Sequence, residues 1–397
     1  MPYVGKKATN AVDVAESQSL TIDDNLTTPS INSGQIGGRR NLAYNGAMKI
    51  AQRGTQTGQT SGDYTACDRF RIVETGDAVV TTSQSTDVPS GQGFANSLKI
   101  DVTTADASVA ASDQYRVEQR LEGQDLQHLL YGTSGAKDLT ISFWVKSPKT
   151  GTHILELRHN DATYFNSQAY TISSADTWQK VTLTFSGYTT TAFDDDAAFS
   201  LGIEWYLMAG SDKTSGTLNS NTWHNTEANR AVGQVNCVDS DANNFYLTGV
   251  QVEVGSVGTE FEHRSFGEEL ALCQRYYRRM ERADGSDSLN AIGRGVAAIR
   301  IGLAQVQSTT RANGVIEFPV AMRAVPTLEL SAVTDIDFAV TTNTPPATDF
   351  TLDSATSYSV QNAFLRFTDS TAGLTVGQAG RLQFNAAEKH IAFDAEL

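Results

Sequence analysis

Catalysis is the first chemistry that this chain could support, and it requires an activated nucleophile or a positioned pair of acids. None of the G-x-S-x-G, H-E-x-x-H, P-loop or dinucleotide-binding patterns occurs in the sequence. The six histidines are scattered, and none lies near an obvious cysteine or serine partner. A glycosidase needs two carboxylates a few ångströms apart, which a linear sequence cannot select. We therefore expect a protein that is not an enzyme.

A metal site is the second chemistry to consider. Asp239, Asp241 and Asn243 copy the first three ligand positions of an EF-hand loop. Asn244 and Val250 stand where that loop needs glycine and glutamate. We interpret the segment as a solvated acidic turn, with a structural calcium ion as the less favoured alternative, and we expect no other cofactor.

Aromatic side chains on a sheet face could stack on sugar rings. Trp144 and Tyr206 fall on the faces opposite the apolar sets of their predicted strands, and Trp223 lies in a polar loop. These three residues are the candidate glycan contacts. The alternative is that both sheet faces are covered, by the other sheet or by neighbouring subunits. Trp178 is expected to pack at a strand start.

Bulk properties exclude several classes of protein. The formal net charge of −15 argues against a nucleic-acid surface, because phosphate binding needs a basic stripe. The three cysteines are an odd number without a C-x-x-C pair, so neither a disulfide framework nor a zinc site is expected. Reduced thiols fit assembly in a cytoplasm. No run of residues is apolar enough to span a membrane, and the N-terminus lacks the apolar segment of a secretory signal, so we expect the protein to leave its cell by lysis or not at all.

Alternating apolar residues predict an all-β protein with two β domains. Residues 41–265 contain many short strands separated by polar turns, such as the one in which Leu139, Ile141, Phe143 and Val145 point inward. This spacing is typical of a two-sheet sandwich. Residues 283–397 alternate in the same way and form a second β-sandwich domain. Adjacent Asp68 and Arg69 are interpreted as a structural ion pair or a turn.

Residues 1–40 are polar, and their few apolar side chains are too scattered to enclose a core. They are either a disordered tail or an extended arm that orders by adding strands to partner subunits.

The stretch from residue 244 to residue 280 joins the two domains. Its first half alternates strictly, with Tyr246 and Val250 on one face and Leu247 and Gln251 on the other. Its second half changes period and predicts a linking helix over 266–282, with Ser265 as its cap. The helix carries an a/d seam made of Phe266, Leu270, Cys273, Tyr277 and Met280. The seam either packs on its own chain or forms a three-fold bundle, and two heptads need flanking domains to hold a trimer.

Two segments resemble proteins of bacteriophage particles, and a third feature, the order of the strands, resembles carbohydrate-binding modules. Residues 247–277, LTGVQVEVGSVGTEFEHRSFGEELALCQRYY, resemble a junction of phage tail fibres and other virion fibres, where it follows a lectin-like jelly roll. The opening MPYVGK resembles the virion-attaching start of tail fibres in some short-tailed marine phages. The order of SFWVKS, VTLTF and the closing strand resembles carbohydrate-binding-module jelly rolls.

The resemblance implies a homotrimeric tail fibre in the virion, assembled in the host cytoplasm. Residues 1–40 would attach it to tail adaptor or nozzle proteins, and 41–265 would form a lectin-like jelly roll. The helix at 266–282 would align three chains, and 283–397 would be the tip that meets a host-surface glycan or outer-membrane receptor. A head fibre or capsid-surface appendage is the alternative, and a polysaccharide-degrading tailspike is less favoured.

Loops on a rigid β-scaffold are the expected places for receptor contacts. In the tip these loops are residues 342–349 and 369–377.

Overall fold

The computed structural model of the protein describes residues 39–59, 61–281, 300–330, 336–339, 350–352, 357–369, 374–384 and 390–397. These residues form antiparallel strands in four sheets, together with a few short helices. The predicted all-β class is confirmed. The predicted arm lies outside the described residues except for positions 39 and 40, as do loop 342–349 and residues 370–373 of the second predicted loop.

Two sheets form the first domain. The six-stranded sheet has the order β1 (Gln56–Gln59), β3 (Val79–Ser85), β4 (Ser97–Thr104), β11 (Asn244–Val254), β6 (Leu139–Lys146) and β9 (Gln179–Phe185). The five-stranded sheet has the order β2 (Arg71–Thr75), β5 (Gln114–Glu122), β10 (Phe199–Ala209), β7 (Gly151–His159) and β8 (Tyr164–Ile172). Short helical turns connect them, namely η1 (Gly123–Asp125), η2 (Gln127–Leu129), α1 (Ser211–Thr214) and η3 (Glu227–Asn229).

Alternate residues of both sheets meet in one core. The four residues predicted to point inward from β6 are fully buried, and Phe143 meets Trp205 of β10 edge to face with ring centroids 5.8 Å apart. The two sheets enclose this core as a sandwich, as the strand spacing predicts.

Strand β11 contains a β-bulge that strict alternation does not predict. Its register with β6 shifts between Thr248 and Gln251, and Gly249 has a φ of +62°, which favours glycine. Leu247 and Val250 consequently both point into the core. Tyr246 therefore lies on the face opposite Val250, and its predicted placement was wrong because one extra residue reverses every later side chain.

The first domain begins and ends at one place. The side-chain amide of Asn41 donates to the Val250 carbonyl at 3.0 Å, and the main-chain N–H of Leu42 donates to the Val252 carbonyl at 2.9 Å. Arg264, which follows β11, donates to the Ala43 carbonyl at 3.0 Å. These bonds hold the start of the domain against its last strand.

Helix α2 (Phe266–Gln274) begins where the sequence predicts. The Ser265 hydroxyl accepts a hydrogen bond from the Glu268 main-chain N–H at 3.2 Å. The predicted helix over 266–282 is wrong beyond Gln274, because the chain continues as strand β12 (Tyr277–Glu281). Strand β12 pairs with β21 (His390–Asp394), and this tertiary pairing overrides the helical period of the sequence.

The second domain therefore begins at β12 and not at residue 283. Its smaller sheet has the order β12, β21 and β15 (Thr327–Leu330). Its larger sheet has the order β16 (Ile336–Ala339), β20 (Ala379–Phe384), β13 (Arg300–Ser308), β14 (Arg311–Glu317), β19 (Asn362–Asp369) and β17 (Phe350–Leu352), with β18 (Ser357–Tyr358) pairing β19. Apolar side chains of both sheets, including Ile391 and Leu365, form its core.

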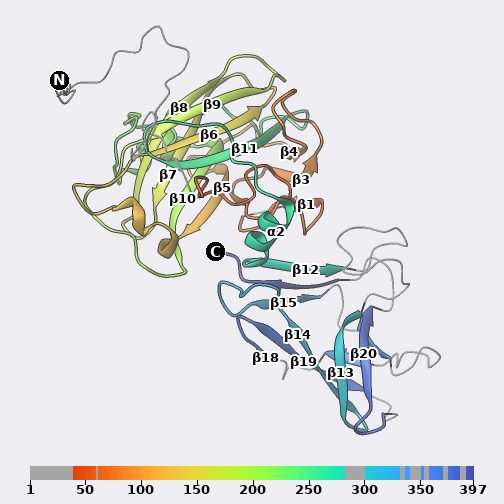
Figure 1. Ribbon diagram of the computed structural model, residues 1–397. Coiled ribbons are helices and arrows are strands. Elements are labelled where there is room, and N and C mark those ends of the chain that lie inside the picture. Colours follow the sequence, from red (N-terminus) through yellow and green to blue (C-terminus); the bar gives the residue numbers. More distant parts are fainter. Residues whose placement is uncertain are drawn as a thin grey trace, which may run out of the picture.

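Figure 1 shows the sandwich above the second domain, with α2 between them and β12 directly below α2 at the near edge of the second domain. The C-terminal end of the chain lies at this junction, beside α2. None of the helices in the described residues is long and apolar enough to cross a membrane.

Candidate functional site

Tyr206, the first candidate glycan contact to consider, is fully buried on β10. Its hydroxyl lies 3.4 Å from a carboxylate oxygen of Glu156, and it packs with Ala231 from the segment at residues 211–236. This segment covers part of the five-stranded sheet. The predicted direct contact between Tyr206 and a glycan was therefore wrong, because the covering segment keeps a ligand from the ring.

Trp223 is half-buried and belongs to the same covering segment. Its indole N–H donates to the Ser186 carbonyl at 2.7 Å. The ring packs into an aromatic cluster whose other members include Tyr131, His159, Tyr188 and Phe193. In this position the side chain anchors segment 211–236 to the sandwich.

The covering segment is fixed to the sheet by a buried ion-pair network. Arg230 donates to Glu156 at 2.6 Å and to Glu204 at 3.1 Å. Arg116 adds a second cation 2.9 Å from Glu204. Both carboxylates are fully buried, so their charges depend on these arginines.

The surroundings of Glu156 and Glu204 shift the pKa values of the two carboxyl groups in opposite directions. Burial, reinforced by the charge of Glu204, raises the pKa of Glu156 above its usual range against the opposing effect of Arg230. Burial also acts to raise the pKa of Glu204, but Arg116 and Arg230 outweigh it and hold that pKa low. Such a separation also occurs in acid–base catalysis. Here the segment that carries Arg230 covers both groups, and the network attaches that segment to the sheet.

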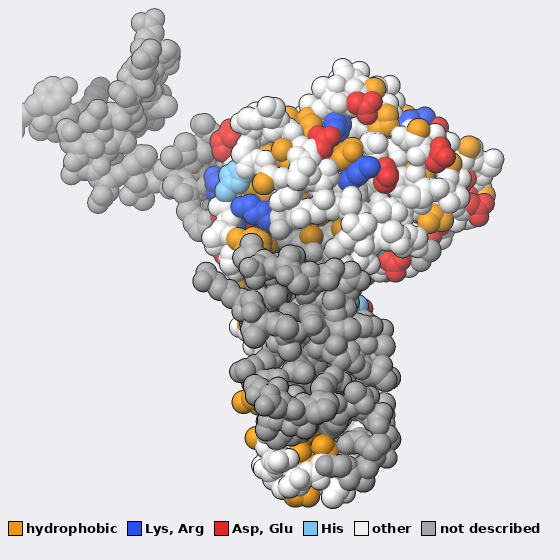
Figure 2. All heavy atoms as spheres, turned by 90° about the vertical axis from the view of Figure 1, so that its right-hand side faces the viewer, with side chains coloured by type: hydrophobic (Ala, Val, Ile, Leu, Met, Phe, Trp, Pro, Cys, Tyr) orange, Lys and Arg blue, Asp and Glu red, His pale blue; other side chains and the backbone are white. Residues whose placement is uncertain are grey.

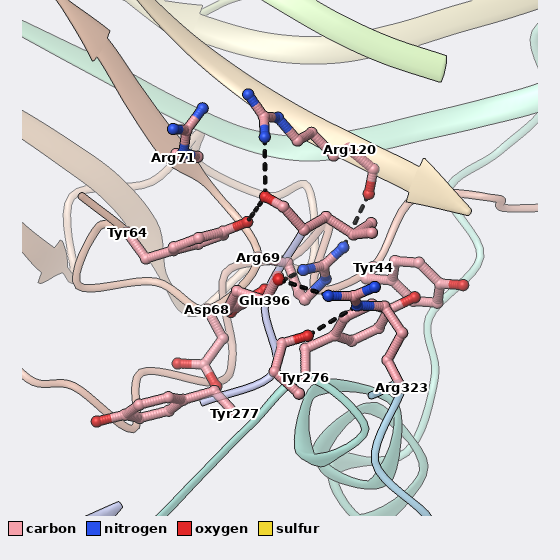
Figure 3. Close-up of polar contacts among 12 residues, drawn as sticks. Tyr44, Tyr64, Asp68, Arg69, Arg71, Arg120, Tyr276, Tyr277, Arg323 and Glu396 are labelled. Atoms are coloured by element: carbon pink, nitrogen blue, oxygen red, sulfur yellow. Dashed lines mark hydrogen bonds and ion pairs between the residues drawn. The ribbon is translucent and has the colours of Figure 1, made fainter. Parts of the chain in front are cut away.

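A second buried polar site joins the two domains (Figure 3). Glu396, two residues beyond β21, inserts its carboxylate between Arg53 and Arg69 of the first domain and forms ion pairs with both. The Arg69 guanidinium also lies 3.4 Å from the ring centroid of Tyr276, and that of Arg53 lies 3.5 Å from the centroid of Tyr277. Both arginines are thereby paired and stacked in the interior.

The main chain around Glu396 is held as well. The Leu397 carbonyl accepts hydrogen bonds from the Tyr64 hydroxyl at 2.8 Å and from Arg120 at 2.9 Å. Arg323 of the second domain donates to the carbonyls of Glu396 and of Ala197, which belongs to the first domain. The junction therefore combines side-chain and main-chain contacts across both domains.

Asp68 lies beside the junction and does not pair with the adjacent Arg69. It accepts hydrogen bonds from the main-chain N–H of Gln52 at 2.8 Å and from the side-chain amide at 2.5 Å. Burial raises the pKa of Asp68 to about 6, against the opposing effects of Arg53 and of the Gln52 hydrogen bonds.

The predicted oligomerisation seam divides into two parts. Phe266 is 56% exposed, and with Leu270 it lines an open groove of about 280 Å³ beside α2. The other three residues of the seam are buried within their own chain: Cys273, Tyr277 and Met280. A single helical seam is therefore wrong, since the last two of these belong to β12, and only the first two remain accessible to another copy.

Trp144 lies half-buried on the outer face of the six-stranded sheet, and its role as a glycan contact stays a prediction. In register beside it are Lys180 of β9 and Thr248 of β11. A side chain at Gly249 would lie 3.0 Å from the Trp144 ring and 2.7 Å from Phe94. The bulge thus makes room for aromatic side chains.

More aromatic side chains share that outer face. Trp178, which directly precedes β9, and Tyr246 of β11 lie with ring centroids 6.1 Å apart. Lys146 of β6 lies between them, 5.7 Å from the Trp178 centroid and 4.4 Å from the Tyr246 centroid. Sequence reasoning missed this group, because it assigned Trp178 to packing and Tyr246 to the other face. Only the strand pairing and the bulge bring these residues together.

The acidic turn at residues 239–243 forms local contacts. Asp239 pairs with Lys149 at 2.6 Å and accepts a hydrogen bond from the Asn243 amide at 2.7 Å. Within the part of the chain that the structure describes, no three histidine, cysteine or carboxylate side chains converge as metal ligands.

On the face of the sandwich seen in Figure 2, basic and acidic side chains are interspersed, with small apolar groups between them. Backbone and the side chains that are neither charged nor hydrophobic cover most of this face. It carries no basic stripe of the kind that tracks a phosphate backbone.

No protein-family model and no curated protein matches the chain. Several solved structures align with about half of it. The enzymatically active domain of tailspike protein 4 of bacteriophage CBA120 has 15% identity and a TM-score of 0.30, and the match covers 54% of this chain and 21% of that one. The family 11 carbohydrate-binding module of cellulase Lic26A-Cel5E of Clostridium thermocellum has 13% identity and a TM-score of 0.26, covering 53% and 98%. The xylan-binding CBM22-2 domain of Paenibacillus barcinonensis Xyn10C has 14% identity and a TM-score of 0.25, covering 47% and 91%. Similarities at this level assign neither a family nor an activity.

Proposed function

We propose that this chain is a structural, non-enzymatic component of a bacteriophage virion, a tail fibre that attaches the particle to a host surface. The observation that carries the proposal is the junction between its two β domains. Glu396 reaches across from the second domain to two buried arginines of the first, and Arg323 bonds main-chain carbonyls on both sides. A dense network of this kind holds two domains at a fixed angle.

A stiff unit of consecutive β domains suits an appendage that must carry a receptor contact away from a particle. The resemblance of residues 247–277 to the junctions of phage fibres supports the same assignment. The buried Glu156 and Glu204 are bound to arginines under segment 211–236, which fits a structural role better than catalysis.

In this proposal the fibre is a homotrimer. Phe266 and Leu270 offer an accessible apolar edge on α2, next to the point where the two domains meet. Residues 1–40 bind the tail, and the second domain faces the host receptor. Weak contacts on three chains then add through effective concentration.

The test is antibody labelling of intact particles with an antibody against the second domain, viewed by electron microscopy. Label at the tips of tail appendages is the expected result. Label over the head would replace the tail fibre with a capsid fibre, and unlabelled particles would overturn both assignments.

A further inference from the structure

The outer face of the six-stranded sheet carries an aromatic surface that the junction and the buried networks do not use. We call it the aromatic face; it comprises Trp144, Trp178, Tyr246, Phe94, Phe261 and His263. Phe94 lies 5.0 Å from Phe261 and 5.5 Å from His263 between ring centroids. All six side chains are half-buried or exposed, so each of them keeps some surface in contact with solvent.

Part of this face is held in a fixed arrangement by polar contacts. The indole N–H of Trp178 donates to Asp87 at 2.9 Å, and the second oxygen of Asp87 pairs with Lys146. The Lys146 ammonium in turn lies against both flanking rings, Trp178 and Tyr246. Burial acts to raise the pKa of Asp87, but the hydrogen bonds from Lys146 and Trp178 outweigh it and lower that pKa, so the carboxylate stays charged. A fixed ring loses less conformational entropy when a ligand binds.

Rings arranged in this way match the chemistry of sugars. The face of an aromatic ring carries negative charge, and the C–H groups on one side of a pyranose carry partial positive charge, so the two stack. Neighbouring ring centroids on the aromatic face lie 4.9 to 6.1 Å apart, comparable to the size of one sugar ring. Several rings in sequence therefore suit an oligosaccharide better than a single sugar.

The charged side chains on the aromatic face indicate which class of sugar it would bind. Lys146 and Lys99 already have carboxylate partners, Asp87 and Asp101. Lys180, in register with Trp144, is exposed and has no ion pair in the part of the chain that the structure describes. An unpaired ammonium beside an aromatic ring can bind a carboxylate on a stacked sugar.

We propose that the aromatic face binds an acidic oligosaccharide, with Trp178, Tyr246 and Trp144 stacking on its rings and Lys180 binding an acid group. The inference rests on the proposed attachment function and adds to it a second host contact, on the first domain, beside the receptor contact proposed for the second domain.

The experiment titrates the full-length protein with tetragalacturonate and with cellotetraose, which differ in the carboxylates, and follows tryptophan fluorescence. Two of the four tryptophans, Trp144 and Trp178, belong to the face, whereas Trp205 is fully buried. We expect tetragalacturonate to bind more tightly than cellotetraose. Trp178→Ala should weaken both at least ~10-fold, and Lys180→Gln should remove most of the preference for the acidic ligand.

Trp223→Phe is the comparison variant, because it changes a candidate glycan contact that lies outside the aromatic face. It should leave both affinities unchanged, and a loss as large as that of Trp178→Ala would place the saccharide site at Trp223 instead. Circular dichroism confirms that each variant is folded. Absence of any fluorescence change at ~10 mM ligand, well above a ~1 mM dissociation constant, overturns the proposal. Equal binding by Trp178→Ala and the parent protein also overturns it. If Trp178→Ala instead dissociates an oligomer without altering saccharide binding, the face is a contact between copies of the chain.

Failure of this inference and failure of the attachment function are distinguishable. Antibody label at the tail tips, together with a protein that binds neither saccharide, would support the fibre assignment and overturn only the aromatic face as its ligand site. Unlabelled particles would overturn the fibre assignment, whatever the result of the saccharide titrations.

Discussion

Arg69 forms a buried ion pair with Glu396, a residue 327 positions further along the chain. Both side chains are nearly inaccessible to solvent, and Tyr276 stacks on the guanidinium from the junction between the domains. The pair therefore couples the first domain, the linking segment and the residues that follow the last strand of the second domain. The ion pair can stabilise the protein only when the two domains of the chain are in contact, since neither domain alone contains both partners.

Replacing Glu396 with alanine should destabilise the protein by about 3–5 kcal/mol, because Arg53 and Arg69 would remain buried without their shared partner. Urea unfolding followed by tryptophan fluorescence measures the change. The matched control is Glu268→Gln, which removes an exposed ion pair with Arg39 and should cost no more than about 1 kcal/mol. Similar unfolding midpoints for the two variants would show that the junction does not contribute to stability.

Arg230→Met should release the segment at residues 211–236 from the five-stranded sheet. Without the arginine, Glu156 and Glu204 face each other in the interior, and the expected loss is about 3–5 kcal/mol. Limited proteolysis with mass spectrometry should then find new cleavage sites within the segment. Lys213→Ala, which removes only the pair with the half-exposed Glu227, should keep the parent pattern. An unchanged pattern for Arg230→Met would mean that other contacts, such as those of Trp223, hold the segment.

The raised pKa of Asp68 makes stability depend on pH in a defined direction. The native state holds this proton more tightly than the unfolded chain does, so the stabilisation is complete below the ordinary pKa near 3.8 and is lost as the pH rises through about 6. The slope cannot exceed about 1.4 kcal/mol per pH unit for one group. In the Asp68→Asn variant this part of the slope should vanish, as measured by thermal unfolding between about pH 4 and pH 7. Parallel curves for the two proteins would contradict the assignment.

Glycine at position 249 of the β11 bulge has two possible reasons, its positive φ and the close approach of Phe94 and Trp144. Gly249→Ala, compared with a second glycine, should separate them. The position has a φ of +62° and would place a Cβ atom 2.7 Å from Phe94. Gly54 has a φ of +68° with open space around it, so Gly54→Ala measures the backbone strain alone, about 1–3 kcal/mol. Gly249→Ala should cost about 1–3 kcal/mol more by urea unfolding, because Phe94 and Trp144 must move. Equal costs would show that the rings adapt freely.

Phe266→Asp tests the accessible edge of α2. The side chain is largely exposed in the single chain, so the substitution should leave the monomer folded while preventing the proposed trimer. Light scattering coupled to size-exclusion chromatography gives the mass of the assembly. Glu268→Gln, on the same helix, serves as the control and should remain trimeric. A Phe266→Asp protein that stays trimeric would place the three-fold contact elsewhere.

The sequence predicts most of the first domain, because alternation is a local property. The inward set of β6 and the Ser265 cap of α2 need no knowledge of distant residues. The end of α2 could not be predicted in this way. The period of the seam continues through Tyr277 and Met280, and only pairing with β21, more than a hundred residues away, converts this stretch into a strand.

The candidate sites also divide into those that local sequence predicts and those that depend on distant residues. Trp144 was placed on an outer face by alternation, and the structure agrees. Tyr206 was also on the face opposite its strand's apolar set, but the covering segment that buries it comes from residues 211–236 and leaves no mark in the strand itself. Glu396 carries no local signal either, because an acidic residue near a chain end is ordinarily solvated and its arginine partners belong to the other domain.

The hydrogen bonds between residues 41–43 and residues 250–264 have a consequence for how such chains can be recombined. The chain enters and leaves the sandwich at the same place, because the two ends of the domain are bonded to each other. The whole first domain could therefore be exchanged as one unit. Swapping it for another sandwich with the same spacing between its ends would leave the route into α2 unaltered. The replacement would need to supply the first-domain groups that hold the second domain, namely the two arginines that receive Glu396, the Tyr64 hydroxyl, Arg120 and the Ala197 carbonyl. The ligand-facing surface of the sandwich could then change while the coupling to the second domain is kept.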